Sequence, residues 1–81
     1  MSVDVEAVAI RLTGDLGLAD AETLCRALVG RPGRAVDVSA LTSAHTAVVQ
    51  ALLALRPPLL GEPADPFLRA HIAPALRAPL P

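Results

Sequence analysis

The sequence contains no tryptophan, tyrosine or lysine, and Phe67 is the only aromatic residue among its 81. Proteins that bind single-stranded nucleic acids usually stack the bases on aromatic side chains, which this chain cannot supply. Its seven basic residues are arginines scattered along the chain, and with eight acidic residues they give a net charge of −1. Because no run of basic residues is present to follow a phosphate backbone, we expect no nucleic-acid partner.

A single cysteine, Cys25, excludes an intramolecular disulfide bond. Cys25 falls on the apolar stripe of a predicted helix, so we expect a small buried hydrophobic residue rather than a nucleophile. The sequence has no closely spaced Cys or His pair for zinc, and it lacks the motifs of phosphate loops, dinucleotide sites and serine hydrolases. We therefore predict no enzymatic activity, no metal site and no cofactor.

Long apolar runs are also missing. No run approaches the roughly 20 residues that a membrane-spanning helix requires, and the N-terminus lacks the basic start and apolar core of a signal peptide. The expected location is the cytoplasm, without insertion into a membrane. The length predicts a single domain over residues 1–81, and its core must be aliphatic because 53% of the residues are hydrophobic.

Hydrophobic periodicity predicts strands that alternate with helices. Alternating apolar and polar residues indicate one or two strands within residues 3–13, followed by a turn at residues 14–17. An apolar stripe with helical spacing predicts a helix over residues 19–29, which Gly30 ends. A short buried strand is expected at residues 34–39. The flanking strands are expected to run parallel because a helix connects them.

The second predicted helix begins between Ser43 and Thr46. Ser43 is the expected N-cap, because its hydroxyl can accept a hydrogen bond from an amide of the first turn. Two consecutive prolines, Pro57 and Pro58, end this helix. The order of strands and helices predicts an α/β sheet with right-handed crossovers.

The C-terminal third predicts a very short strand at residues 59–60 and a helix that starts at Pro66. Asp65 is the expected N-cap of this helix. Its spacing places Phe67 inward together with Leu68 and Ile72, and Pro74 should kink or end it. A frayed tail is expected at residues 79–81.

One loop gathers polar side chains where an α/β sheet usually carries its function, after the carboxyl end of a strand. The polar residues there are Ser39, Thr42, Ser43, His45 and Thr46. The helix that follows offers unpaired amides and the positive end of its dipole, which stabilise a phosphoryl group or an acidic side chain. Simple capping of the helix and phosphorylation of a hydroxyl are both compatible with this pattern.

Two segments resemble STAS domains. Residues 11–28, RLTGDLGLADAETLCRAL, are similar to the second strand and first helix of the family, which Gly-(Asp/Glu)-Leu connects. Residues 36–53, VDVSALTSAHTAVVQALL, are similar to its signature strand, loop and helix, and the spacing from Gly14 to Asp37 fits. The remaining tail resembles a shortened last strand and final helix.

The resemblance implies a STAS-like α/β domain, with a mixed sheet of four to five strands and three helices packed on one face. It also implies a non-enzymatic interaction module in bacterial regulation or signalling. STAS domains serve as anti-sigma-factor antagonists, as stressosome and transporter modules, and as partner subunits of lipid-transport ATPases. In the antagonists, a partner kinase phosphorylates a Ser or Thr at the start of the second helix and thereby breaks the complex. Thr46 matches that position, and Ala47 occupies the next one.

This chain departs from the family pattern at three positions. His45 stands where the family usually has Asp, Val48 where it has Gly, and Gly17 where many antagonists have Asp. A β-branched residue in place of Gly narrows the backbone conformations at the start of the helix. These departures favour a module that docks without phosphorylation, through the N-terminal end of the second helix. The expected contact residues are Ser43, His45, Thr46, Val49 and Gln50.

Two further interpretations remain open. One is a phospho-switch antagonist with Thr46 or Ser43 as the acceptor. The other is a small partner subunit of a transport ATPase or a self-assembling structural subunit, because a homodimer would bury part of the aliphatic surface. The expected partner is a protein: a sigma-regulatory kinase, a signalling component or a transport ATPase.

Overall fold

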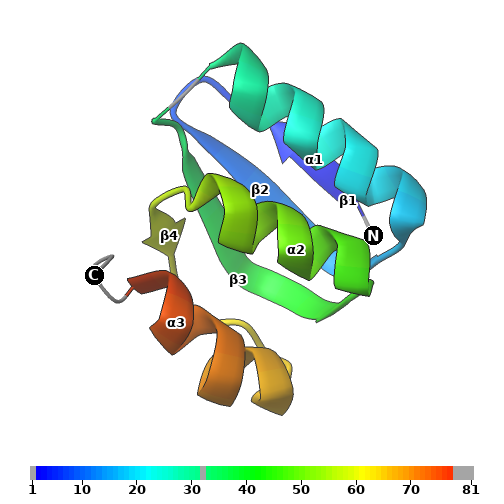
Figure 1. The fold of residues 1–81 in the computed structure, drawn as a ribbon, viewed down its shortest axis with the longest axis vertical. Coiled ribbons are helices and arrows are strands. Elements are labelled where there is room, and N and C mark those ends of the chain that lie inside the picture. Colours follow the sequence, from blue (N-terminus) through cyan, green and yellow to red (C-terminus); the bar gives the residue numbers. More distant parts are fainter. Residues whose placement is uncertain (1, 32, 78–81) are drawn as a thin grey trace.

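The structure is a computed structural model that describes residues 2–31 and 33–77 (Figure 1). Its strands are β1 (Ser2–Val5), β2 (Ala9–Leu16), β3 (Ala35–Ala44) and β4 (Leu59–Leu60). Its helices are α1 (Leu18–Gly30), α2 (Thr46–Leu55), the π-helical turn η1 (Leu68–Ile72) and α3 (Ala73–Arg77). Because η1 continues directly into α3, these two form one C-terminal helical segment. The predicted α/β class is confirmed, and the frayed tail predicted at residues 79–81 lies outside the described residues.

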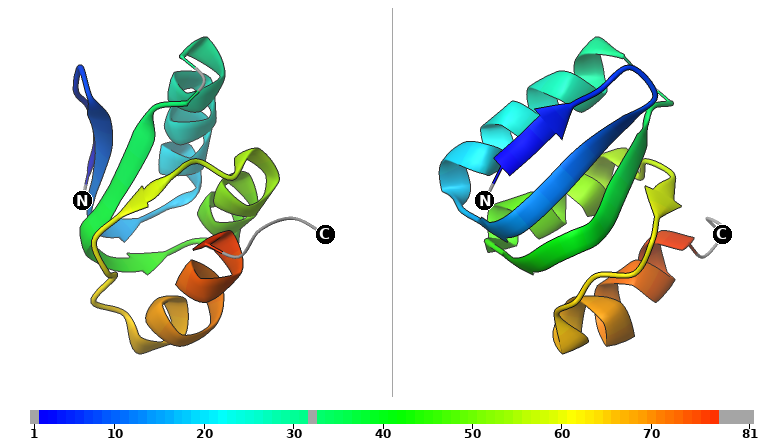
Figure 2. Two further views of the ribbon diagram at one scale, coloured as in Figure 1. Left: turned by 90° about the vertical axis from the view of Figure 1, so that its left-hand side faces the viewer. Right: turned by 180° about the vertical axis from the view of Figure 1, so that it is seen from behind.

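The four strands form one mixed sheet in the order β1-β2-β3-β4. The β1 strand runs antiparallel to β2, whereas β2, β3 and β4 are parallel to one another. The N-terminal segment therefore contains two separate strands, one of the two alternatives that the sequence left open. Helices α1 and α2 cover one face, the C-terminal segment lies on the same side near β4, and the other face is open (Figure 2).

An aliphatic core fills the space between the sheet and its helices, as composition predicts. Alternate residues of β2, Ile10 and Leu12, point into it and are fully buried, while Arg11 between them is exposed. The other large side chains that are almost completely buried are Leu16, Leu24, Val36, Leu41 and Val48. No polar or charged residue is buried among the described residues, so the core contributes packing and no chemistry.

The turn predicted at residues 14–17 is wrong. β2 continues to Leu16, which pairs with Ala44 of β3. Gly14 has a φ of 77°, and the pairing shifts register between Gly14 and Asp15. A glycine that looks like a turn signal is instead a β-bulge inside a long strand, where positive φ is tolerated. β3 is correspondingly longer than the predicted 34–39, and it brings residues 40–44 into the sheet.

The C-terminal segment begins as predicted at Asp65, whose Oδ1 accepts hydrogen bonds from the amides of Phe67 (2.8 Å) and Leu68 (3.0 Å). Pro74 does not end the helix. The amide of Ala73 donates to the carbonyl of Leu68, five residues earlier. This wider π-helical turn lies directly before the proline, which has no N–H to give and would crowd a regular turn.

Candidate functional site

The predicted loop lies where the carboxyl ends of β2 and β3 meet the start of α2. Asp15 is paired with Ser43 in the sheet, and the Ser43 hydroxyl donates a hydrogen bond to the Asp15 carboxylate. The amide of His45 donates to the carbonyl of Leu16 at 2.8 Å. These contacts hold the start of α2 to the ends of two parallel strands, which is where the sequence placed the functional edge.

The N-cap of α2 is His45, and the expectation that Ser43 caps this helix is wrong. The Nδ1 of His45 accepts a hydrogen bond from the amide of Ala47 at 2.9 Å. Ser43 lies inside β3, where the pairing with Asp15 directs its hydroxyl to that carboxylate instead. Because this bond occupies Nδ1, the His45 side chain serves to cap α2.

Thr46 is the first residue of α2, and it is exposed. Ser43 is half-buried and its hydroxyl is engaged. The first turn of α2 carries no acidic residue that would neutralise the positive end of its dipole. Of the two predicted phospho-acceptors, Thr46 is therefore the one that faces solvent at a helix N-terminus.

A groove of about 320 Å³ opens beside this helix start, between β3, α2 and the C-terminal segment. The residues that line it are Ser43, Ala44, Thr46, Val49, Asp65, Phe67, Leu68 and Ile72. Three of the five predicted contact residues, Ser43, Thr46 and Val49, thus face one groove. His45 and Gln50 are exposed nearby and do not line it.

Phe67 is the functional candidate that the sequence analysis missed. The prediction that it points inward is wrong, because 60% of its surface is exposed at the groove. Leu68, Ala73 and Leu76 form the buried face of the C-terminal segment, and Phe67 lies on the flank of that face. Its ring packs against His71, with 5.2 Å between the ring centroids. The N-cap at Asp65 was the signal in the sequence that could have shown the position of Phe67. The residue at which a helix begins sets which of the following residues point toward the core.

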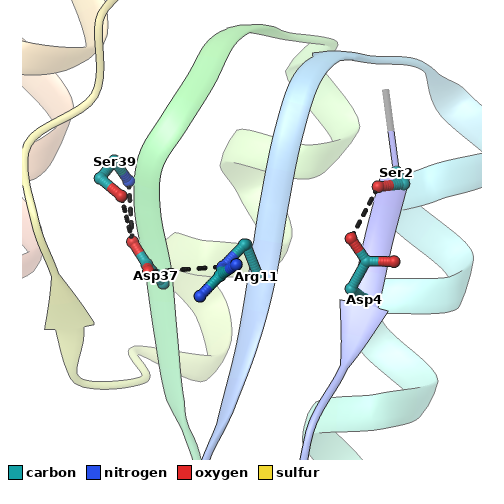
Figure 3. A network of polar contacts seen from close by, with 5 residues as sticks. All are labelled: Ser2, Asp4, Arg11, Asp37 and Ser39. Atoms are coloured by element: carbon teal, nitrogen blue, oxygen red, sulfur yellow. Dashed lines mark hydrogen bonds and ion pairs between the residues drawn. The ribbon is translucent and has the colours of Figure 1, made fainter.

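The open face of the sheet carries a row of charges, which Figure 3 shows. Arg11 stands between Asp4 on β1 and Asp37 on β3, and its Nε lies 3.8 Å from the Asp37 carboxylate. Hydrogen bonds from the hydroxyl and the amide of Ser39 lower the pKa of Asp37, and Arg11 adds to this effect. Asp37 therefore stays ionised near neutral pH and is unsuited to donate a proton. Ser39, predicted in the polar loop, belongs to this row and not to the groove.

A metal site and Cys25 are the remaining chemical candidates. Among residues 2–31 and 33–77, no three His, Cys, Asp or Glu side chains are placed to hold a metal ion. Cys25 is half-buried on α1, less than predicted. In the same part of the chain, no helix has the length and apolar character needed to cross a bilayer.

Comparisons with protein-family models, curated proteins and solved structures found no match.

Proposed function

We propose that this protein is a regulatory interaction module that binds a partner protein in the groove between α2 and the C-terminal segment. The observation that carries the proposal is Phe67, the only aromatic residue, which lies 60% exposed at the groove while the core is built entirely from aliphatic residues. Aromatic side chains supply much of the binding energy at protein interfaces. Fully burying such a side chain contributes about 1.5–3 kcal/mol.

The composition of the groove indicates what the partner presents. Val49, Leu68 and Ile72 offer apolar contacts, while Thr46 and Ser43 place hydroxyls at the rim. Two carboxylates lie at this groove. Asp65 lines it directly, and Asp15 is hydrogen-bonded to Ser43, which lines it. A segment with an apolar side chain flanked by a basic one would match this arrangement.

The resemblance of residues 11–28 and 36–53 to STAS domains supports the same proposal from the sequence. It suggests a sigma-regulatory kinase, a signalling component or a transport ATPase as the partner, and a cytoplasmic location is part of the proposal. The polar groups of the site support binding rather than catalysis, because they satisfy one another: Ser43 with Asp15 and His45 with Ala47.

The test is an affinity pull-down from the native cell extract, read by mass spectrometry, with wild type and Thr46→Glu as baits. Thr42→Glu is the matched control, because Thr42 is also an exposed threonine but does not line the groove. A protein captured by wild type and Thr42→Glu, and lost with Thr46→Glu, supports docking at the groove. Equal capture by all three baits would remove the groove from the proposal, and thermal melts verify that each variant is folded.

A phospho-switch at Thr46 is the second candidate, favoured by its exposure at the start of α2. A phosphoryl group there would lie at the positive end of the helix dipole, which stabilises negative charge. Ser43 is a poorer acceptor because its hydroxyl already faces the Asp15 carboxylate. Incubation with the cognate kinase and ATP should add about 80 Da to wild type and to Ser43→Ala, but not to Thr46→Val. An unchanged mass of wild type beside a working control substrate would exclude the switch.

A further inference from the structure

A second hollow lies at the opposite end of the sheet from the groove. It has a volume of about 490 Å³ and is bounded by the end of β1, the C-terminal half of α1, and Arg31 and Arg34 ahead of β3. Its lining residues are Val5, Thr23, Arg26, Ala27, Gly30, Arg31 and Arg34. We call it the arginine pocket. The proposed docking groove shares no residue with it, and the resemblance assigns it no role.

Arg34 is the unusual residue of the arginine pocket. It is half-buried, and its Nε and Nη1 are inaccessible to solvent and have no hydrogen-bond partner among the described residues. A guanidinium remains protonated in proteins, so its donors cannot be silenced by losing a proton. Leaving charged donors buried and unpaired is unfavourable. The fold therefore leaves this cation without an internal counter-charge, and an anion in the pocket that Arg34 lines would supply one.

The charged side chains that line the arginine pocket are all basic. Arg26, Arg31 and Arg34 line the pocket, and no acidic residue does. Arg26 pairs with Glu22 at 2.8 Å, but both side chains are about three-quarters exposed, so this pair binds weakly. The Arg31 side chain makes no hydrogen bond or ion pair with another described residue. The C-terminal end of α1 contributes only about half a negative charge, which the arginines exceed.

We propose that the arginine pocket binds a small phosphomonoester. The two arginines without partners, Arg31 and Arg34, match the near-double negative charge of a phosphoryl group better than the single charge of a carboxylate. Val5, Ala27 and Gly30 form an uncharged wall that an organic body can contact. The volume of about 490 Å³ lies within the range of small-molecule sites.

The test uses the intact chain and amide NMR titrations with four probes: glycerol 3-phosphate, AMP, inorganic phosphate and the monocarboxylate glycerate. We expect shifts at Thr23, Gly30 and Arg34 with at least one phosphomonoester, and binding about tenfold tighter than that of inorganic phosphate or glycerate. Equal binding of inorganic phosphate would overturn the role of the organic body. Equal binding of glycerate would overturn the preference for a phosphoryl group. No shift with any probe at 10 mM would overturn the site itself.

Variants separate the pocket from general charge effects. Arg34→Ala should weaken binding about tenfold or more, and Arg34→Lys should recover only part of it because the ammonium group of lysine lacks the planar guanidinium. Arg11→Ala removes the same charge from the open sheet face and should change affinity less than about twofold. Should Arg34→Ala fail to fold, Arg31→Ala at an exposed position gives the same readout. Wild-type affinity in Arg34→Ala and Arg31→Ala would contradict the proposal.

Discussion

The two ends of the parallel strands β2 and β3 carry opposite kinds of surface. At their carboxyl ends, the side chains of Ser43 and His45 already have partners, the Asp15 carboxylate and the Ala47 backbone amide, and the feature left open is the apolar ring of Phe67. At their amino ends, the guanidinium of Arg34 has no partner for its buried Nε and Nη1 among the described residues. Under the two proposals, the first end takes an apolar segment of a protein and the second takes an anion, so the two ends of one small sheet would serve different kinds of recognition.

The largest effect on stability is expected from substitutions in the core, which both ends of the sheet share. Leu16 is 1% exposed and lies beneath the start of α2, so Leu16→Ala should lower the free energy of unfolding by about 2–5 kcal/mol. Phe67→Ala should lower it by less than about 1 kcal/mol because most of the ring is already in water. Urea unfolding of both variants measures this contrast. A loss as large for Phe67→Ala as for Leu16→Ala would show that Phe67 belongs to the core.

A smaller effect is expected where the groove depends on a helix cap. Asp65 accepts the amides of Phe67 and Leu68 and so fixes the first turn on which Phe67 stands. Asp65→Ala should lower the free energy of unfolding by about 1 kcal/mol, and Asp65→Asn or Asp65→Ser should recover most of it. Thermal melts of the three variants provide the comparison. Identical melting of Asp65→Ala and wild type would exclude this cap.

At the amino ends of the strands, replacing the unpaired guanidinium of Arg34 should change the free energy of unfolding in the opposite direction. Arg34→Met replaces buried donors without partners by an apolar chain of similar length. The free energy of unfolding should stay constant or rise by about 1 kcal/mol in phosphate-free buffer. Urea unfolding provides the value. A marked loss of stability would mean that Arg34 already has a stabilising partner in the folded chain.

The smallest effect on stability is expected on the open face of the sheet, between its two ends. The pKa of Asp37 is lowered from its ordinary value of 3.8 by Ser39 and Arg11. Because the folded value lies below the unfolded one, this contribution is present above about pH 4 and fades as the pH falls through the folded pKa. Wild type should therefore lose slightly more stability between pH 6 and pH 3 than Asp37→Asn does. Parallel pH profiles from urea unfolding would contradict this assignment.

Local signals in the sequence predicted much of the fold. The helical stripe of α1, the two leucines of β4 and the Asp65 cap each depend on residues close together in the chain, and the structure has all three. Gly14 misled the prediction because a bulge and a turn use the same backbone conformation. The strand that follows Gly14 depends on pairing with β3, which is a non-local contact.

The sites were predictable to different degrees for the same reason. Ser43, Thr46 and Val49 were expected together because one loop and one helix turn carry them. Phe67 joins them only through the packing of the C-terminal segment against β3 and α2. The arginine pocket needs β1 and the far end of α1 to meet. No short stretch of sequence encodes that meeting, so Arg34 looked like one scattered arginine among seven.

The central claim is that Phe67 anchors a partner in the groove, and affinity measured with Phe67→Ser tests it most directly. Val8→Ser is the matched control, because Val8 is 85% exposed and does not line the groove. By calorimetry with the partner identified by pull-down, Phe67→Ser should weaken binding by about 2 kcal/mol, roughly thirtyfold, while Val8→Ser binds like wild type. Wild-type affinity in folded Phe67→Ser would contradict the account.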